Sequence, residues 1–158
     1  MRYRVDAHPS RLRGVPLAGL ARIVTKRFRM KKDISVAFVT PAEIKRLNTV
    51  YRGKQEATDV LSFSFLPGAR AHTRARTLPE RAAPVESAIG GEILLCSEIV
   101  RAKARERGRA LADELTALLL HATLHILGYD HERKSEAETM EALELELLAT
   151  AGRRLAKS

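Results

Sequence analysis

The chain has 158 residues with a net charge of +9, and its 45% hydrophobic residues are almost all aliphatic, which is enough for the core of one domain. Its single cysteine excludes an internal disulfide and fits a reducing compartment. No segment reaches the ~18–20 apolar residues needed to span a bilayer, and the first residues lack the apolar stretch of a signal peptide, so we expect a cytoplasmic protein.

The apolar pattern predicts strands and helices that alternate irregularly along the chain. We interpret these elements as an α+β fold and predict a single domain over residues 1–158, with a small mixed sheet of about four strands flanked by helices. The first half of the chain is predicted to form an edge strand at 1–7, a helix at 16–30, a strand at 34–39, a helix at 41–53 and a strand at 60–65. The second half is predicted to form a strand at 89–96 and then helices at 97–107, 110–127 and 135–150.

Several local features place the ends of these elements. Thr40 before a proline is a helix start, and Ser97 is expected to cap a helix in the same way. Ser135 with Glu138 forms a capping box for the last helix, which we expect to turn its glutamates outward and to end at Gly152. The paired glycines of the strand at 89–96 indicate a bulge or a close backbone approach.

Two segments differ from this regular pattern. Residues 67–88 are rich in proline and arginine and have no apolar period, which predicts a mobile basic loop inserted into the domain. Residues 110–127 are apolar nearly all round, which predicts a central buried helix. This helix carries two histidines in an otherwise apolar sequence.

The segment HATLHILGYDH, from His121 to His131, contains three of the five histidines of the chain. His121 and His125 are one helical turn apart and therefore project from one face. Gly128 allows a sharp turn that can return His131 to the same point. Three imidazoles at ~2.0–2.1 Å would hold a zinc ion and leave a fourth position for water, and Asp130 is the nearest acceptor for a second ring nitrogen.

Other interpretations of this cluster remain open. The histidines could be core residues bonded to backbone, or the metal could be purely structural in a ribosome assembly factor without activity. The spacing matches the ligands of metzincin proteases, but Ala122 replaces their catalytic glutamate, so a metalloprotease would need a carboxylate base from elsewhere. A divalent ion can also activate water against a phosphodiester, which predicts a nuclease.

The distribution of charge favours the nuclease. Residues 1–81 hold 18 Lys/Arg against 6 Asp/Glu, whereas residues 82–158 hold 10 against 13. Arginine is the more common cation, and its planar guanidinium suits phosphate oxygens. We expect a polyanionic partner such as RNA or DNA, although a purely solubilising surface would have the same composition.

Together these segments resemble the YbeY family of bacterial endoribonucleases, also called rRNA maturation factors. The resemblance covers roughly residues 34–150. It rests on the histidine segment, on LNTVYRGKQEATDVLSFSF (47–65), on GGEILLC (90–96) and on SEAETMEALELELL (135–148). Ser64 stands where the family usually has proline, and the insertion at 67–88 is longer than the usual connection.

The resemblance implies a metal-dependent endoribonuclease that cuts single-stranded RNA, matures the 3′ end of 16S rRNA and acts in ribosome quality control. It implies partners in the small ribosomal subunit, with ribosomal proteins or a ribosome-assembly GTPase as further candidates, and leaves the oligomeric state open. The three histidines carry over as ligands of one divalent ion, taken as Zn²⁺.

The basic segment YRGK (51–54) is expected to face the substrate. By the same resemblance, Arg52 carries over as the catalytic arginine, and its guanidinium could stabilise charge on the scissile phosphate. Lys54 is assigned to substrate binding. Asp59 and Asp130 are expected to support the site from behind, with Asp59 fixing the loop at its rim. From the residues alone, the simpler interpretation is that Arg52 complements the dipole of its helix.

Overall fold

The fold is built around one mixed β-sheet. A computed structural model describes residues 1–6, 8–67, 88–131 and 133–155 of the chain. The spatial order of the strands is β1-β2-β4-β3. β1, β2 and β4 run parallel, and β3 pairs antiparallel with β4. The strands are β1 (Tyr3–Val5), β2 (Asp33–Phe38), β3 (Val60–Ser64) and β4 (Ile89–Leu95). The predicted α+β class and small mixed sheet are confirmed, with β1 at an edge.

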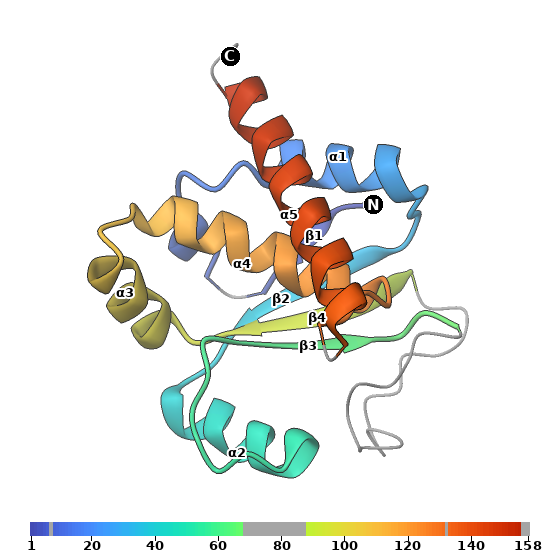
Figure 1. Cartoon of the computed structure of the whole chain (residues 1–158). Helices are drawn as coiled ribbons and strands as arrows, with labels where there is room; N and C mark the ends of the chain where they lie inside the picture. The colour runs from blue at the N-terminus through green and yellow to red at the C-terminus, as the bar shows by residue number, and fades with distance from the viewer. Residues whose placement is uncertain (7, 68–87, 132, 156–158) are drawn as a thin grey trace.

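The helices cover both faces of this sheet. Figure 1 shows α1, α4 and α5 on one face and α2 on the other, with α3 beside the end of β4. The helices are α1 (Leu17–Phe28), α2 (Pro41–Arg52), α3 (Ser97–Glu106), α4 (Leu111–Ile126) and α5 (Lys134–Leu155), with a short 3₁₀ helix at Pro9–Leu12. None of the described helices combines the length and apolar character needed to cross a membrane.

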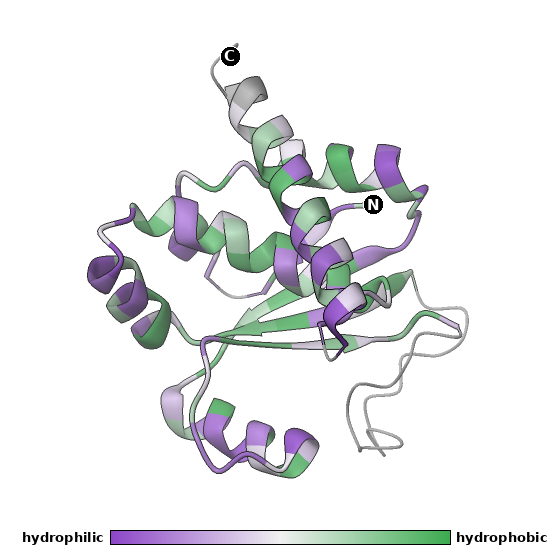
Figure 2. Ribbon diagram, in the orientation of Figure 1, coloured by the Kyte–Doolittle hydropathy of each residue, from purple (hydrophilic) through white to green (hydrophobic). Residues whose placement is uncertain are grey.

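The alternation of side chains along β3 separates two apolar clusters. Leu61 and Phe63 are buried toward α2 in a small cluster that includes Cys96, which is fully buried. The intervening Ser62 and Ser64 are therefore presented to the opposite face, because successive side chains of a strand alternate. The larger cluster lies on that face, and Figure 2 shows the apolar character of α4 and of the strands beneath it.

The histidine-bearing helix α4 lies against the sheet and is buried as predicted, with Leu119, Leu124 and Ile126 fully inaccessible. Its end approaches β4 closely at Gly91, where a Cβ atom would lie 2.7 Å from the side chain of Ile126. The register of β2 against β4 also shifts by one residue at Gly90. The glycine pair therefore has both roles expected of it, a bulge and a close backbone approach.

Most predicted element ends are close to the observed ones, but the last helix ends later than predicted and Ser135 is not its cap. Thr40 caps α2 by accepting a hydrogen bond from the Glu43 N–H at 3.2 Å. Ser135 lies one residue inside α5, and the helix continues through Gly152 to Leu155, because a buried Ala151 keeps this turn packed and a glycine costs a helix only about 1 kcal/mol.

Two further expectations concern the beginning of α3 and the basic loop. Ser97 is the first residue of α3 rather than its cap, and no side-chain cap bond is formed by Cys96 before it. Of the predicted basic loop at 67–88, only its two end residues are described, and residues 68–87 lie outside the described part of the chain.

Candidate metal centre

Three histidines converge at the end of α4. His121 and His125 project from one face of the helix, and their Nε2 atoms lie 3.1 Å apart. Gly128 has a φ of 94°, the left-handed conformation that glycine adopts most easily, and the chain turns there. His131 thereby returns to the cluster, and one nitrogen from each of the three rings lies within 4.8 Å of the others.

The second nitrogen of each helical histidine has its own partner. The Nδ1 of His125 lies 3.0 Å from the carbonyl oxygen of Tyr129 in the turn after α4. The Nδ1 of His121 lies 2.5 Å from a carboxylate oxygen of Glu144 on α5. With protons on both Nδ1 atoms, the Nε2 lone pairs are directed toward each other and toward His131.

The expected acceptor Asp130 takes a different primary partner. Its carboxylate accepts a hydrogen bond from the backbone N–H of His131 at 2.7 Å and lies 3.9 Å from the Nδ1 of His125. Asp130 therefore fixes the turn that carries the third histidine. The neighbouring Tyr129 carbonyl is the closer acceptor for the His125 ring.

The environment of His125 favours its neutral form. Burial, followed by the neighbouring rings of His121 and His131, lowers the pKa of His125 from its ordinary 6.5 to about 4. The positive charge of Arg52 acts in the same direction. A neutral imidazole is the form that binds a metal ion, so this ring is in the ligating state at neutral pH.

The arrangement fits a metal ion. Two imidazole nitrogens that bind one tetrahedral ion at ~2.0–2.1 Å must be about 3.3–3.4 Å apart. The observed separation of 3.1 Å between the Nε2 atoms of His121 and His125 is close to that value. His131 is exposed, so its ring can adjust. The three histidines can therefore hold a metal ion, with nitrogen donors of the kind that zinc accepts.

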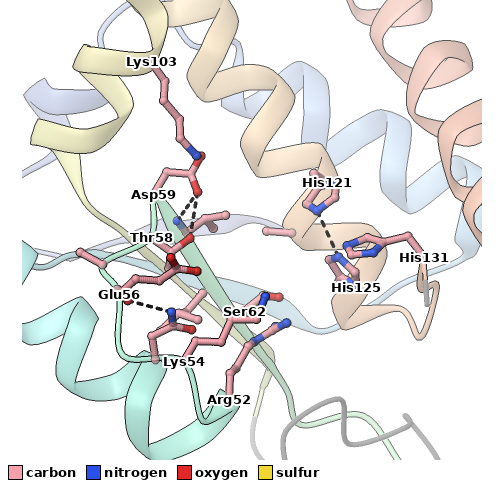
Figure 3. Close-up of a pocket in the computed structure, with 15 residues that line it drawn as sticks. Arg52, Lys54, Glu56, Thr58, Asp59, Ser62, Lys103, His121, His125 and His131 are labelled. Carbon is pink, nitrogen blue, oxygen red and sulfur yellow. Dashed lines mark hydrogen bonds and ion pairs between the residues drawn. The ribbon is translucent and has the colours of Figure 1, made fainter.

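A pocket of about 400 Å³ opens beside the three histidines. Figure 3 shows the histidines along one side of it and the loop from α2 to β3 along the other. The lining side chains include three cations, which are Arg52, Lys54 and Lys103. Ser62 of β3 and Ala122 of α4 also line it, so the position of the protease glutamate is occupied by a methyl group.

Arg52 is the last residue of α2 and faces the pocket. Its Nε is buried and makes no hydrogen bond with any residue that the structure describes. The loop that follows Arg52 is held to α2 by the buried Asn48, whose side-chain amide donates a hydrogen bond to the carbonyl of Glu56 at 2.8 Å. The backbone N–H of Lys54 donates to the carbonyl of Asn48 at 3.3 Å. The two basic residues are thus held at the pocket by a tethered loop.

Asp59 lies at another part of the rim. One of its oxygens accepts hydrogen bonds from the hydroxyl of Thr58 and the N–H of Val60, both at 3.1 Å. The other is paired with Lys103 of α3 at 2.8 Å. The expected loop-fixing bonds are present. Burial alone would raise the pKa of Asp59, but Lys103 and Thr58 lower it below its ordinary 3.8, so the group is an anion.

Two residues of this site were missed by the sequence analysis, Glu144 and Lys103. Lys103 was not distinguished from the other cations of its helix. The glutamates of the last helix were expected to point outward, but the Glu144 side chain is only 26% exposed. One indication was available, because Glu144 follows Met140 by one turn and adjoins Leu143, both on the buried stripe of α5.

The fold and the site together define a class: an α+β domain with three convergent histidines that can hold a metal ion, beside an arginine-containing pocket. Comparison with known proteins identifies the family. Residues 18–152 match the family described as Endoribonuclease YbeY. An Endoribonuclease YbeY of Paraburkholderia phymatum is 35% identical over 138 residues, which is 87% of this chain and 80% of that protein.

Two other similar proteins agree with this match. An Endoribonuclease YbeY of Chromohalobacter salexigens is 41% identical over 119 residues, covering 75% of this chain and 68% of that protein. The solution structure of TM1509 from Thermotoga maritima has a TM-score of 0.61 and 26% identity, and the match covers 98% of this chain and 92% of that one. The chain belongs to the YbeY endoribonuclease family.

Proposed function

We propose that this chain is a zinc-dependent endoribonuclease that cleaves single-stranded RNA. Its family supports the nuclease activity. The observation that carries the proposal is the presence, in one pocket, of three convergent imidazoles and a buried guanidinium nitrogen without a partner among the described residues. The basic N-terminal half of the chain supplies the long-range attraction for a polyanion.

The three histidines bind the ion in this proposal. His121 and His125 present their Nε2 atoms from a rigid helix, and His131 completes the set from the following turn. When bound there, a divalent ion would activate water and neutralise charge on the phosphoryl group. Asp130 contributes indirectly, since its bond to the N–H of His131 holds the turn.

Arg52 binds the scissile phosphate. An unpaired buried donor costs a folded protein about 1–3 kcal/mol, and a phosphate oxygen at the Arg52 Nε would remove this penalty. The planar guanidinium can hold two phosphate oxygens at once, and it stabilises the charge that develops on them. Lys54, on the same tethered loop, adds a second positive charge that attracts the neighbouring phosphates of the RNA.

The size of the pocket supports a single-stranded substrate. A volume of about 400 Å³ is near the lower end of the range for small-molecule sites. It suits one nucleotide turned out of a flexible strand, whereas the phosphates of a paired helix are held at a fixed spacing around a wider body. We therefore propose that an unpaired nucleotide enters between the histidines and the α2–β3 loop.

The biological setting is part of the same proposal. We place the activity in the cytoplasm, at the 3′ end of small-subunit rRNA and in ribosome quality control, with ribosomal proteins or an assembly GTPase as partners. The two competing functions are less well supported. A protease of the metzincin type would use a glutamate at the position of Ala122, and here a methyl group lines the pocket at that position. A purely structural metal would call for a fourth protein ligand, and the described His/Cys/Asp/Glu cluster has three members.

The proposal is tested by cleavage of a single-stranded RNA with the parent protein, Arg52→Ala and His125→Ala, purified in parallel. We expect the parent to cut, His125→Ala to lose both zinc and cleavage, and Arg52→Ala to keep zinc but lose cleavage. Equal cleavage by all three preparations would identify a contaminating nuclease and contradict the proposal. A duplex of the same sequence should be cut much more slowly.

A further inference from the structure

We infer that Glu144 is a positioning residue that holds the ring of His121 in its ligating orientation, so that the C-terminal helix forms part of the metal centre. The inference rests on the proposed function, because it concerns the ion that the three histidines would bind. Glu144 itself does not line the pocket. It contacts the His121 ring at Nδ1, whereas the Nε2 of that ring is the atom that lies near His125. It therefore does not touch the substrate.

The contact is short and comes from a distant part of the chain. A carboxylate oxygen of Glu144 lies 2.5 Å from the Nδ1 of His121, and the two residues are 23 positions apart in the sequence. The side chains are 26% and 34% exposed, so the interaction is partly shielded from solvent. Figure 1 shows α5 crossing α4, and the contact between His121 and Glu144 lies where these two helices meet.

The packing of α5 keeps the carboxylate in place. Met140, Leu143 and Leu147 are buried in the main apolar cluster, and they bracket Glu144 on the inner side of the helix. Glu141, three residues earlier, is exposed. The position of Glu144 is therefore fixed by the packing of the whole helix α5 against the core. It differs in this from a glutamate on the exposed side of the helix, whose side chain is free to move.

Holding the Nδ1 proton of His121 has two consequences for the ring. The neutral ring keeps its proton on Nδ1, which leaves the Nε2 lone pair available, and rotation about the last side-chain bond is restricted because the hydrogen bond would be lost. His125 obtains the same support from the Tyr129 carbonyl, which is local in sequence. Without Glu144, His121 would be the less well oriented of the two helical ligands.

A simple ion pair between α4 and α5 is the competing explanation. Such a pair would contribute to the stability of the metal-free protein and have no special effect on metal affinity. A positioning residue affects metal affinity directly, and loss of a hydrogen-bonded partner of a ligating histidine typically weakens metal binding roughly 10–100-fold. The two explanations therefore differ in a measurement that does not involve RNA.

The experiment is a competition of each protein with a chromophoric chelator for Zn²⁺ at neutral pH. The variants are Glu144→Ala, which removes the acceptor, Glu144→Asp, which withdraws it by one methylene, and Glu144→Gln, which keeps an oxygen in place. Glu141→Ala, on the exposed side of the same helix, is the control. Circular dichroism of the metal-free proteins establishes which variants are folded, and Glu144→Asp decides the question if Glu144→Ala is not.

We expect zinc affinity to fall roughly 10–100-fold in Glu144→Ala, and in the same direction in Glu144→Asp, with Glu144→Gln closer to the parent and Glu141→Ala unchanged. Parent-like affinity in both Glu144→Ala and Glu144→Asp overturns the inference, as does a loss in Glu144→Gln as large as in Glu144→Ala. Weaker zinc binding in Glu144→Ala together with a parent that cuts no RNA would support the inference and contradict the nuclease. A parent that binds no zinc contradicts both.

Discussion

The hydroxyl of Ser64 on β3 donates a hydrogen bond to the backbone carbonyl oxygen of Ile126, the last residue of α4, at 2.7 Å. The last carbonyls of a helix have no partner within the helix, so this bond satisfies one of them. It also joins the strand that lines the pocket to the helix end one residue after His125. Two elements of the candidate site are thereby fixed to each other.

Removing this hydroxyl should loosen the junction. We expect Ser64→Ala to lower the free energy of unfolding by about 0.5–1.5 kcal/mol, the usual contribution of one intramolecular hydrogen bond. Ser62→Ala, on the same face of the same strand, should have a smaller effect. Urea unfolding with a chelator present measures both. Equal stability of the parent and Ser64→Ala would show that water replaces the hydroxyl at no cost.

Zinc should stabilise the parent and not a ligand variant. An ion that binds only the folded state adds about 2.7 kcal/mol when its concentration is 100 times the dissociation constant. For a domain of this size each kcal/mol raises the melting temperature by roughly 2–4 °C. We expect a rise of that order in the parent and none in His125→Ala, measured by calorimetry with and without zinc. A similar rise in both would place the ion elsewhere.

Arg52 should matter for cleavage but not for folding. Because its buried Nε has no partner among the described residues, Arg52→Ala removes an unsatisfied donor, and the free energy of unfolding should be unchanged or higher. Single-turnover cleavage should fall roughly 10²–10³-fold, as for removal of one charge-stabilising donor. Arg52→Lys should rescue little, because an ammonium lacks the planar fork.

A control for this variant is available on the same helix. Arg46 is exposed on α2 and pairs with Glu43 at 2.8 Å, away from the pocket lining. Arg46→Ala should cleave RNA as the parent does. A comparable loss in Arg46→Ala would mean that the general charge of α2 matters, and full activity in Arg52→Lys would mean that one positive charge at that position is sufficient.

The parts of the site that sequence predicted are local ones. The spacing of His121 and His125 fixes their common face, and Gly128 permits the turn that returns His131, so the cluster follows from eleven consecutive residues. Glu144 was not predicted, because its contact with His121 depends on the angle at which α5 crosses α4. That angle is decided by packing between helices, and no spacing within either segment contains it.

The same distinction applies to the fold. Four strands and their approximate ends follow from local apolar patterns, but the position of β4 between β2 and β3 is a long-range property. The role expected of Arg52 came from resemblance, since a helix C-terminal arginine has a simpler explanation in the helix dipole. Only the tertiary structure shows that its Nε is buried at the pocket.

Asp59 should make stability depend on acid pH. Its folded-state pKa is below the ordinary 3.8 of an unfolded chain, because Lys103 and Thr58 outweigh the opposing effect of burial. Its contribution is therefore complete above the unfolded pKa and is lost as the pH falls through the lowered one. We expect Asp59→Asn to be less stable than the parent at pH 7, with the difference shrinking as the pH falls below about 4.

Urea unfolding of the metal-free proteins across this pH range tests the prediction. Lys103→Met should also make the free energy of unfolding depend less on pH in this range, because it removes the partner that lowers the pKa of Asp59. A difference between the parent and Asp59→Asn that does not change with pH would show that Asp59 acts through its hydrogen bonds alone and not through its charge.

Gly91 sets the distance between β4 and the end of the histidine helix. A Cβ atom there would lie 2.7 Å from the side chain of Ile126 and 2.8 Å from the carbonyl oxygen of Phe63, and that oxygen belongs to the paired strand β3. We expect Gly91→Ala to cost about 1–3 kcal/mol of unfolding free energy as an overpacked site, and to weaken zinc binding because Ile126 follows His125 directly. Gly19→Ala in α1, where the nearest atom is 3.8 Å away, should instead be neutral or stabilising. Denaturant unfolding and zinc competition measure the stability and the zinc affinity of both variants. A Gly91→Ala protein with the stability and the zinc affinity of the parent would contradict this account.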